Sequence, residues 1–239
     1  MRLHKFIANC GYTSRRRAEL LIQAGRVEVN GKVLTSLGTT MDPTKDKVTI
    51  NGEEISPPQA RTIMLNKPRG IITSTHDTHE RLTVMDILPR SLRNAGVLPA
   101  GRLDQDTEGL LILTNDGDLS HRITHPRFET EKEYEAFVQS RPSPEAIRRL
   151  EAGIQLDGEQ TSPAKVTSVE PAAGKTRVCI VIREGKKRQV RRMFEAIGND
   201  VLTLTRLRIG GLWLRDLSTG KWRDLSPKEI EDLTSGQRP

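Results

Sequence analysis

The feature of this sequence that most constrains its fold is an acidic loop that leads directly into an apolar run. The loop, residues 101–109, has the sequence GRLDQDTEG, and the run that follows at residues 110–113 is LLIL. Four apolar residues closed by Asn-Asp-Gly are typical of a short buried strand that ends in a turn. A loop anchored to such a strand is held rigidly, and a reactive carboxylate requires rigid positioning. A reactive carboxylate is therefore one interpretation of this loop.

The loop taken by itself also fits two less specific interpretations. Asp104, Asp106, Glu108 and Gly109 match positions 1, 3, 5 and 6 of a calcium-binding EF-hand loop. Position 12 would then be Asn115 instead of a bidentate glutamate, and the flanking run is strand-like instead of helical, which argues against calcium. A solvated acidic turn is the other interpretation, and the spacing of the carboxylates does not exclude it.

The charge of the chain indicates a polyanionic partner. Lys and Arg outnumber Asp and Glu by 38 to 31, which gives a net charge of +7 and a pI of about 9.6. Such a chain is suited to nucleic acid, although many soluble proteins are mildly basic. Aromatic residues are only 3% of the chain, so we expect electrostatic contacts with phosphates instead of extensive base stacking.

Composition argues against several classes of protein. A chain of 239 residues, 35% of them hydrophobic, holds one large domain or a large and a small one. It has no apolar run of about 18 residues and no apolar segment behind its N-terminus, so we expect neither a membrane span nor a secretion signal. The two cysteines and five histidines lack ligand spacing. We therefore expect free thiols, no metal site and a cytoplasmic location.

The N-terminal part of the chain has the pattern of a small separate domain. Apolar residues at helical spacing predict a helix over residues 3–10, and a second helix over residues 15–24 follows the N-cap Ser14. An alternating segment that ends in Asn30-Gly31 predicts a β-hairpin. A strand-like unit at residues 47–52 closes the domain.

Two adjacent prolines, Pro57 and Pro58, mark the end of this domain. They predict an extended and semi-rigid linker. We therefore divide the chain into an N-terminal domain (1–56), a linker (57–61) and a larger domain (62–239).

A basic cluster stands at the start of the second predicted helix. Three cations there oppose the helix macrodipole, whose positive end lies at the N-terminus. A bound phosphate would relieve that electrostatic cost, so the cluster indicates RNA contact, whereas a solvated helix start is the simpler alternative. We extend the expected RNA contact to the tip of the hairpin. The residues are Arg15, Arg16, Arg17 and Lys32.

The larger domain alternates strand and helix patterns. Its strand patterns are apolar or alternating, and its helix patterns carry N-caps or apolar residues at helical spacing. We predict strands over residues 63–65, 71–74, 110–113, 132–138, 176–182 and 201–209, and helices over residues 82–88, 118–124, 144–150, 190–197 and from Ser226.

The segment 184–198 combines strong positive charge with helical periodicity. Five of the eight residues from 185 to 192 are basic. Apolar residues recur at i, i+3, i+4 and i+7 from Val190, which predicts an amphipathic helix that ends at Gly198. A charged helix face is usually only solvated, but these cations crowd the helix start, where an anion binds favourably.

Five segments resemble motifs of one enzyme family, the pseudouridine synthases, in the RsuA-like branch that carries an S4 RNA-binding domain. The N-terminal helices and hairpin resemble the S4 module, so the resemblance covers essentially the whole chain. The segments are LNKPRG at 65–70, GRLDQDTEGLLILTNDGDL at 101–119, KEYEAFV at 132–138, EGKKRQVRRMFEAIG at 184–198 and Leu-x-Arg-x-x-Ile-Gly-Gly at 204–211.

The resemblance implies a fold, a reaction and a set of catalytic residues. The fold is α+β: a small S4 domain and a catalytic domain with a mixed, largely antiparallel central sheet and a cleft. The reaction is the isomerisation of a specific uridine to pseudouridine in ribosomal RNA, without cofactor or metal. Asp104 would be the catalytic aspartate, Arg191 would pair with it, and Tyr134 would stack on the base.

The resemblance and the charge pattern together imply an RNA-binding surface. Arg102 resembles the arginine that occupies the vacated stack after the target base flips out, and Lys67 lies in a motif usually assigned a structural and nucleotide-contacting role. The partner would be ribosomal RNA, free or in a pre-ribosomal particle, bound by a monomer without membrane association. The remaining candidates for RNA contact are Lys186, Lys187, Arg188 and Arg192.

Other functions fit parts of the sequence. A non-catalytic S4-type RNA-binding or ribosome-assembly protein would explain the charge, but not the presence of Asp104, Tyr134 and Arg191 in their motifs. A nucleoside hydrolase would release free uracil and would need no S4 domain. Within the family, the sequence is nearer the enzymes of the large ribosomal subunit than that of the small subunit, and the small-subunit alternative stays open.

Overall fold

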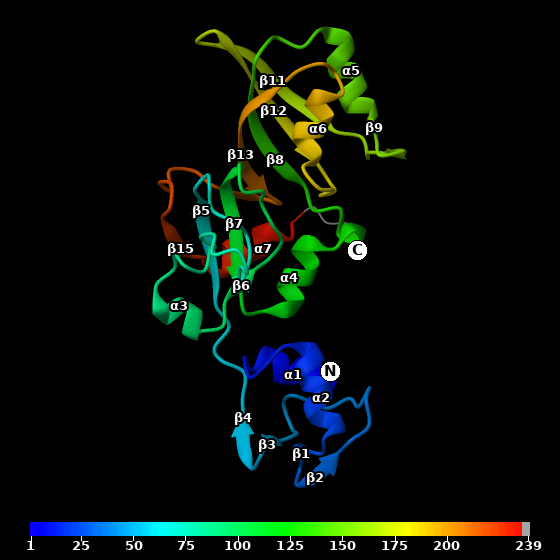
Figure 1. Cartoon of the computed structure of the whole chain (residues 1–239), viewed down its shortest axis with the longest axis vertical. Coiled ribbons are helices and arrows are strands. Elements are labelled where there is room, and N and C mark those ends of the chain that lie inside the picture. The colour runs from blue at the N-terminus through cyan, green and yellow to red at the C-terminus, as the bar shows by residue number, and fades with distance from the viewer. Residues whose placement is uncertain (236–239) are drawn as a thin grey trace. The chain divides into compact units, whose positions relative to one another are not determined.

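The computed structural model describes residues 1–235, which form two compact units (Figure 1). The smaller unit comprises Met1–Arg61 together with Arg90–Val97 and Asn115–Gly117. The larger unit comprises Thr62–Pro89, Leu98–Thr114 and the described residues from Asp118 onward. Each unit has its own core and is described by itself.

The smaller unit begins with two helices, α1 (Leu3–Asn9) and α2 (Arg15–Gln23), as predicted. Ser14 caps α2 by accepting a hydrogen bond from the backbone N–H of Arg17 at 3.4 Å. An antiparallel sheet follows, in the order β2-β1-β3-β4. Its strands are β1 (Val27–Val29), β2 (Lys32–Leu34), β3 (Val48–Ile50) and β4 (Glu53–Ile55).

The hairpin predicted at Asn30-Gly31 is present, with both residues at positive φ, 53° and 74°. The second Asn-Gly pair, Asn51-Gly52, makes another hairpin between β3 and β4, where we expected a single closing strand. The helices and the sheet enclose a small core that includes Phe6, Ile7, Ile22, Val27 and Ile50. The short helix α3 (Arg90–Asn94) also belongs to this unit.

The larger unit is built on one mixed sheet in the order β11-β12-β8-β13-β7-β5-β15, with β14 beside β13 and β6 beside β7. Only β7 and β13 pair in parallel among the strand pairs described for this sheet, so the predicted mixed, largely antiparallel architecture is confirmed. The strands are β5 (Thr62–Lys67), β6 (Leu98–Pro99), β7 (Glu108–Thr114), β8 (Lys132–Val138), β11 (Lys165–Ala172), β12 (Lys175–Ile182), β13 (Val201–Ile209), β14 (Leu212–Trp213) and β15 (Trp222–Asp224).

Helices flank this sheet at the positions that the caps and periodicity predicted. Figure 1 shows α5 and α6 near the β11–β12 end of the sheet, where α5 packs beside β11 and α6 beside β13. Ser143 caps α5, and Ser226 with Glu229 forms a complete capping box on α7. The elements are α4 (Gly117–Thr124), the 3-10 turn Pro126–Phe128, α5 (Pro144–Ala152), the small hairpin β9 (Gln155–Leu156) and β10 (Glu159–Gln160), α6 (Gln189–Glu195) and α7 (Pro227–Leu233).

The core below the acidic loop explains its anchorage. Met64 of β5 packs with Leu110 and Ile112 of β7, and all three are fully buried. Leu119 and Ile123, from one face of α4, close this cluster. The apolar run after the acidic loop is therefore the buried strand that the sequence predicted.

Two predictions between residues 71 and 88 are wrong. Residues 71–74 do not form a strand, and only an isolated bridge joins Ile72 to Thr83. Residues 82–88 do not form a helix, and residues 84–87 form a turn instead. The backbone N–H and the hydroxyl of Thr83 each donate to the carboxylate of Asp86 at 2.8 Å. Such a local side-chain bond offers the backbone an alternative to a helix.

The two halves of the large sheet meet where β7 and β13 pair in parallel. The register there is short, with Glu108 opposite Thr205 and Gly109 opposite Arg206. Gly109 has a φ of +103°, and a Cβ on it would lie 2.4 Å from the carbonyl oxygen of Arg206. Only glycine allows the two backbones to approach this closely. Gly109 therefore fixes where the acidic loop lies relative to β13 and β8.

We predict that Gly109→Ala lowers the free energy of unfolding by about 3 kcal/mol or more, because the strain of a positive φ is added to a backbone clash. Urea denaturation followed by circular dichroism measures the change. Gly174→Ala is the matched control, since Gly174 has a φ of +79° but nothing within 4 Å of the added Cβ. It should lose only about 1 kcal/mol. Equal losses in the two variants would show that the close approach of β7 and β13 is not needed for stability.

Candidate active site

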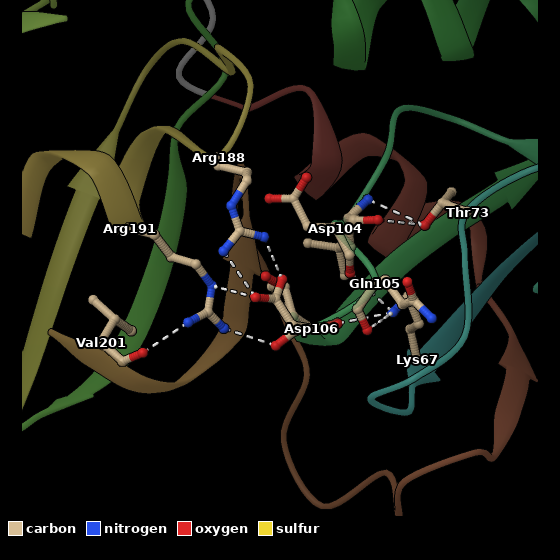
Figure 2. A network of polar contacts seen from close by, with 10 residues as sticks. Lys67, Thr73, Asp104, Gln105, Asp106, Arg188, Arg191 and Val201 are labelled. Carbon is tan, nitrogen blue, oxygen red and sulfur yellow. Dashed lines mark hydrogen bonds and ion pairs between the residues drawn. The ribbon is translucent and has the colours of Figure 1, made fainter. Parts of the chain in front are cut away.

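The acidic loop lies between β6 and β7 and presents Asp104 with an uncommitted side chain. Asp104 is half-buried. Within residues 1–235 its carboxylate accepts no hydrogen bond and has no cation within 4.0 Å. Figure 2 shows dashed lines to the neighbouring Asp106 but none from the Asp104 side chain. A carboxylate held in this way remains available to a ligand.

The backbone of the loop is held from below by Lys67, at the end of β5. Lys67 is fully buried, and its Nζ donates to the carbonyl oxygens of Asp104 at 3.1 Å, Thr107 at 2.9 Å and Pro68 at 3.1 Å. Burial lowers the pKa of Lys67 to about 8, against the opposing charges of nearby carboxylates. We expected Lys67 to contact RNA. In the structure Lys67 lies beneath the loop with 0% of its surface exposed, and its Nζ binds backbone carbonyls.

The segment after Lys67 holds the other side of the loop. The hydroxyl of Thr73 donates to the carbonyl of Leu103 at 2.8 Å and accepts from its backbone N–H at 3.2 Å. The backbone N–H of Gly70 donates to the carbonyl of Gln105 at 2.8 Å. The LNKPRG segment and the residues after it therefore fix the backbone of the loop on both sides of Asp104.

Asp106, two residues after Asp104, carries the ion pairs of the loop. Arg188 grips its carboxylate with two donors, each at 2.9 Å. Arg191 places its Nε 3.3 Å from the same carboxylate, and its Nη2 donates to the Asp106 carbonyl at 2.7 Å (Figure 2). The expected pair between Arg191 and Asp104 is not formed. Arg191 binds Asp106 instead, and its Nη1 donates to Val201 at 2.8 Å.

The electrostatics of Asp106 follow from these contacts. Partial burial by itself would raise the pKa of the Asp106 carboxyl. The hydrogen bonds from Arg188 and the charges of Arg191 and Arg188 outweigh that effect, so the pKa lies below its ordinary value. Asp106 thus stays ionised as the partner of two arginines, and these arginines tie α6 to the loop.

A cavity of about 530 Å³ opens beside Asp104. Tyr134 of β8 and Leu204 of β13 line it together with the loop, and Tyr134 is only 8% exposed. A carboxylate, an aromatic ring and several cations therefore share one cavity. The predicted site residues that line it are Arg102, Asp104, Tyr134, Lys186, Lys187 and Arg188.

Three predicted residues of the larger unit do not line this cavity. Lys67 and Arg191 hold the loop from outside it. Arg192 forms an ion pair with Asp157 at 2.6 Å. Lys186 does line the cavity, but it also pairs with Glu159 at 2.9 Å. Asp157 and Glu159 therefore already neutralise part of this basic segment.

Sequence reasoning missed Asp106, Lys132 and Arg206. Asp106 lies in the same loop as Asp104, and carboxylate spacing alone does not tell which of the two is paired. Lys132 and Arg206 line the cavity. The alternation of side chains along β13 points to Arg206, because Arg206 falls on the same face as buried Leu204. A charged side chain on a buried face is costly unless it has a partner or a function.

The basic residues predicted on the smaller unit are exposed. Arg15, Arg16 and Arg17 form the first turn of α2, and their side chains are exposed. Lys32 is also exposed and lies just after the hairpin turn. Their exposure is compatible with the expected RNA contact.

Residues 1–235 contain no group of three or more His, Cys, Asp or Glu side chains that could hold a metal ion. Cys10 and Cys179 are both free thiols, and burial raises the pKa of Cys10 to about 11. No helix in the same range is both long and apolar enough to span a bilayer.

We predict that Asp106→Asn makes stability less dependent on pH in the acidic range. A carboxyl with a depressed pKa stabilises the fold above its unfolded value, about 3.9, and loses that contribution as pH falls through its folded value. The variant should be less stable than the wild type at pH 7, and the difference should shrink below about pH 4. Urea denaturation at pH 7, 5 and 3 tests this. An unchanged difference at every pH would contradict the ion pairs described, and the exposed Asp200, as Asp200→Asn, serves as control.

Comparison with known proteins relates this geometry to a family. The family model described as RNA pseudouridylate synthase matches residues 61–196, and that of the S4 domain matches residues 1–47. A Bacillus subtilis (strain 168) protein named Ribosomal large subunit pseudouridine synthase B is 42% identical over 234 residues, which is 97% of this chain and 95% of that protein.

Two further relatives give the same result. An uncharacterized RNA pseudouridine synthase of Aquifex aeolicus (strain VF5) is 39% identical over 233 residues, covering 98% of this chain and 93% of that protein. A crystal structure described as that of a pseudouridylate synthase has 36% identity and a TM-score of 0.69, and covers 98% of this chain and 99% of its own. The chain therefore belongs to the RNA pseudouridylate synthase family, in its S4-domain-containing, RsuA-like branch, and is a pseudouridine synthase.

Proposed function

We propose that this enzyme isomerises one specific uridine of ribosomal RNA, in the large subunit, with Asp104 as its nucleophile. The ribosomal substrate is supported by the relative that is named for the large ribosomal subunit and matches nearly the whole chain. The observation that carries the role of Asp104 is its carboxylate, which is unpaired within the described part of the chain and lines the cavity while Lys67 and Thr73 hold the backbone around it.

The chemistry of the reaction requires such a carboxylate. The bond between C1′ and N1 breaks, and its electron pair leaves with the uracil, which becomes an anion. C1′ is then electron-deficient, and a carboxylate attacks or shields such a centre, as in retaining glycosidases. The base rotates, C5 bonds to C1′, C5 loses its proton and N1 gains one, so the product is an isomer. Asp104 can act at C1′ or at C6 of the base, and either route needs it ionised and unpaired.

Tyr134 and Arg191 have different roles in this proposal. Tyr134 lies in the cavity wall, where its ring can stack on the uracil and its hydroxyl can help to remove the C5 proton late in the cycle. Arg191 is a positioning residue, because it binds the carboxylate and the carbonyl of Asp106 and so orients the loop that carries Asp104. Its effect on Asp104 passes through the loop backbone instead of through a direct ion pair.

RNA would be held by exposed cations around the cavity and on the S4 domain. A uridine in structured RNA must flip out of its stack to enter a buried pocket, and Arg102, exposed at the rim, would occupy the space it leaves. Lys187 and Arg188 would contact phosphates beside the cavity. Arg15, Arg16, Arg17 and Lys32 would supply salt-dependent affinity and orientation. We propose that the enzyme acts as a monomer in the cytoplasm, on ribosomal RNA that is free or in a pre-ribosomal particle.

The test maps pseudouridine in ribosomal RNA from cells with and without this protein, by reverse-transcription stops that depend on carbodiimide. We expect one stop in large-subunit RNA to disappear without the protein. Wild-type protein should restore it, whereas Asp104→Asn should not, because that nearly isosteric change removes the nucleophile. Purified Asp104→Asn should bind the RNA with nearly wild-type affinity.

Other outcomes would refute parts of the proposal. A stop lost from small-subunit RNA would overturn the choice of subunit. Full restoration of the stop by Asp104→Asn would remove Asp104 from the mechanism. No lost stop at all would favour a binding role in ribosome assembly, and Asp106→Asn, tested in parallel, shows whether the effect belongs to Asp104 or to any carboxylate of the loop.

A further inference from the structure

One guanidinium of the cavity wall has a donor without a partner. Arg206 lies on β13 directly opposite Tyr134 of β8, and only 3% of it is exposed. Its Nε donates to the carbonyl of Leu110 at 2.7 Å, and its Nη1 lies 3.5 Å from the Tyr134 hydroxyl. Its Nη2 is buried and has no hydrogen-bond partner within residues 1–235. A native fold rarely leaves such a donor unpaired without a function.

The charge of Arg206 is also uncompensated. Within the described chain no carboxylate lies within 4.0 Å of its guanidinium. A second cation, Lys132, lines the same cavity, and among the described residues its Nζ donates only to the carbonyl of Thr130, at 3.0 Å. Burial, together with the charge of Arg206, lowers the pKa of Lys132 to about 8. Arg206 is buried and Lys132 is half-buried, and within residues 1–235 neither has a carboxylate within 4.0 Å, so together they form a site for an anion.

The surroundings of these cations distinguish a base from a phosphate. Tyr134, Leu204 and Ile182 line the cavity beside them and are each at most 8% exposed. Flat apolar and aromatic walls suit a planar ring. A phosphate of the RNA backbone would instead meet the exposed cations at the rim, such as Arg102 and Lys187.

We propose that Arg206, supported by Lys132, binds the uracil ring and stabilises the negative charge that it carries after the bond between C1′ and N1 breaks. This inference rests on the proposed reaction of Asp104. The electron pair of the broken bond spreads over N1, O2 and O4 of the uracil, and the free Nη2 donates to one of these oxygens. A fixed donor in a site that excludes water stabilises developing charge far better than solvent does. Asp104 and Arg206 thus act on the opposite fragments of the same bond.

Two other roles for Arg206 make different predictions. If it only braces the sheet through Leu110 and Tyr134, its loss should slow every substrate alike. If it contacts a backbone phosphate, its loss should weaken RNA binding in a salt-dependent way and leave the rate of the bound complex unchanged.

The experiment measures single-turnover loss of the target nucleoside, with uridine or 5-fluorouridine at the mapped position of a ribosomal RNA fragment. Fluorine stabilises the uracil anion, so the fluorinated substrate depends less on Arg206. With uridine, Arg206→Gln should be slower than wild type by about 100-fold at saturating enzyme. With 5-fluorouridine, the loss should be about 10-fold or less, and Arg206→Lys should be intermediate because it keeps the charge but not the planar fork.

Matched variants keep the test decisive. Arg208→Gln removes a neighbouring arginine of β13 that pairs with Glu131 and Glu133 instead of lining the cavity, so it should not discriminate between the substrates. Lys132→Gln should discriminate in the same direction as Arg206→Gln, which tests the site even if the Arg206 variants do not fold. Equal losses on both substrates, or a loss confined to RNA affinity, would overturn the proposal. A wild-type enzyme that converts neither substrate would instead refute the proposed function.

Discussion

The active-site architecture depends on one close backbone contact, between Gly109 at the start of β7 and Arg206 in β13. This short parallel pairing joins the β5–β7 half of the large sheet to the β8–β13 half. Each half brings part of the site: the acidic loop enters β7 directly, whereas Tyr134 and Arg206 stand on β8 and β13. Because a side chain at position 109 would separate the two backbones, the distance between Asp104 and the opposite cavity wall is set by a residue with no chemistry of its own.

The loop divides two tasks between two similar residues. Asp106 accepts the ion pairs with Arg188 and Arg191 that fasten the loop to α6, while Lys67 fastens its backbone from beneath. Asp104 keeps its carboxylate free of both. A nucleophile tied up in a strong ion pair would have to break that pair before it could react. Because Asp106 forms the ion pairs, the loop is held rigidly and Asp104 has no ion pair to break. This is the preorganisation that catalytic groups require.

Much of this arrangement was predictable from the sequence, and the rest depends on contacts between distant segments. Caps, Asn-Gly turns and periodicity predicted α2, α5, α7, the first hairpin and the buried strands, because these are local signals. The apolar pattern around Thr83 and Asp86 wrongly predicts a helix, since two hydrogen bonds to the Asp86 carboxylate favour a turn there. The choice of Asp106 over Asp104 as the partner of Arg191 spans 85 residues of sequence and cannot be read from spacing. The sequence shows that Lys67 is charged but not that it is buried, and its burial determines its role.

The central claim, that Arg191 acts on Asp106 and leaves Asp104 free, is tested most directly by two double-mutant cycles on the free energy of unfolding. One cycle combines Arg191→Met with Asp106→Asn, and the other combines Arg191→Met with Asp104→Asn. We predict a coupling of about 1 kcal/mol or more in the first cycle and a coupling near zero in the second. A large coupling between Arg191 and Asp104, with none between Arg191 and Asp106, would show that Asp104 itself is the partner of Arg191 and would contradict this account.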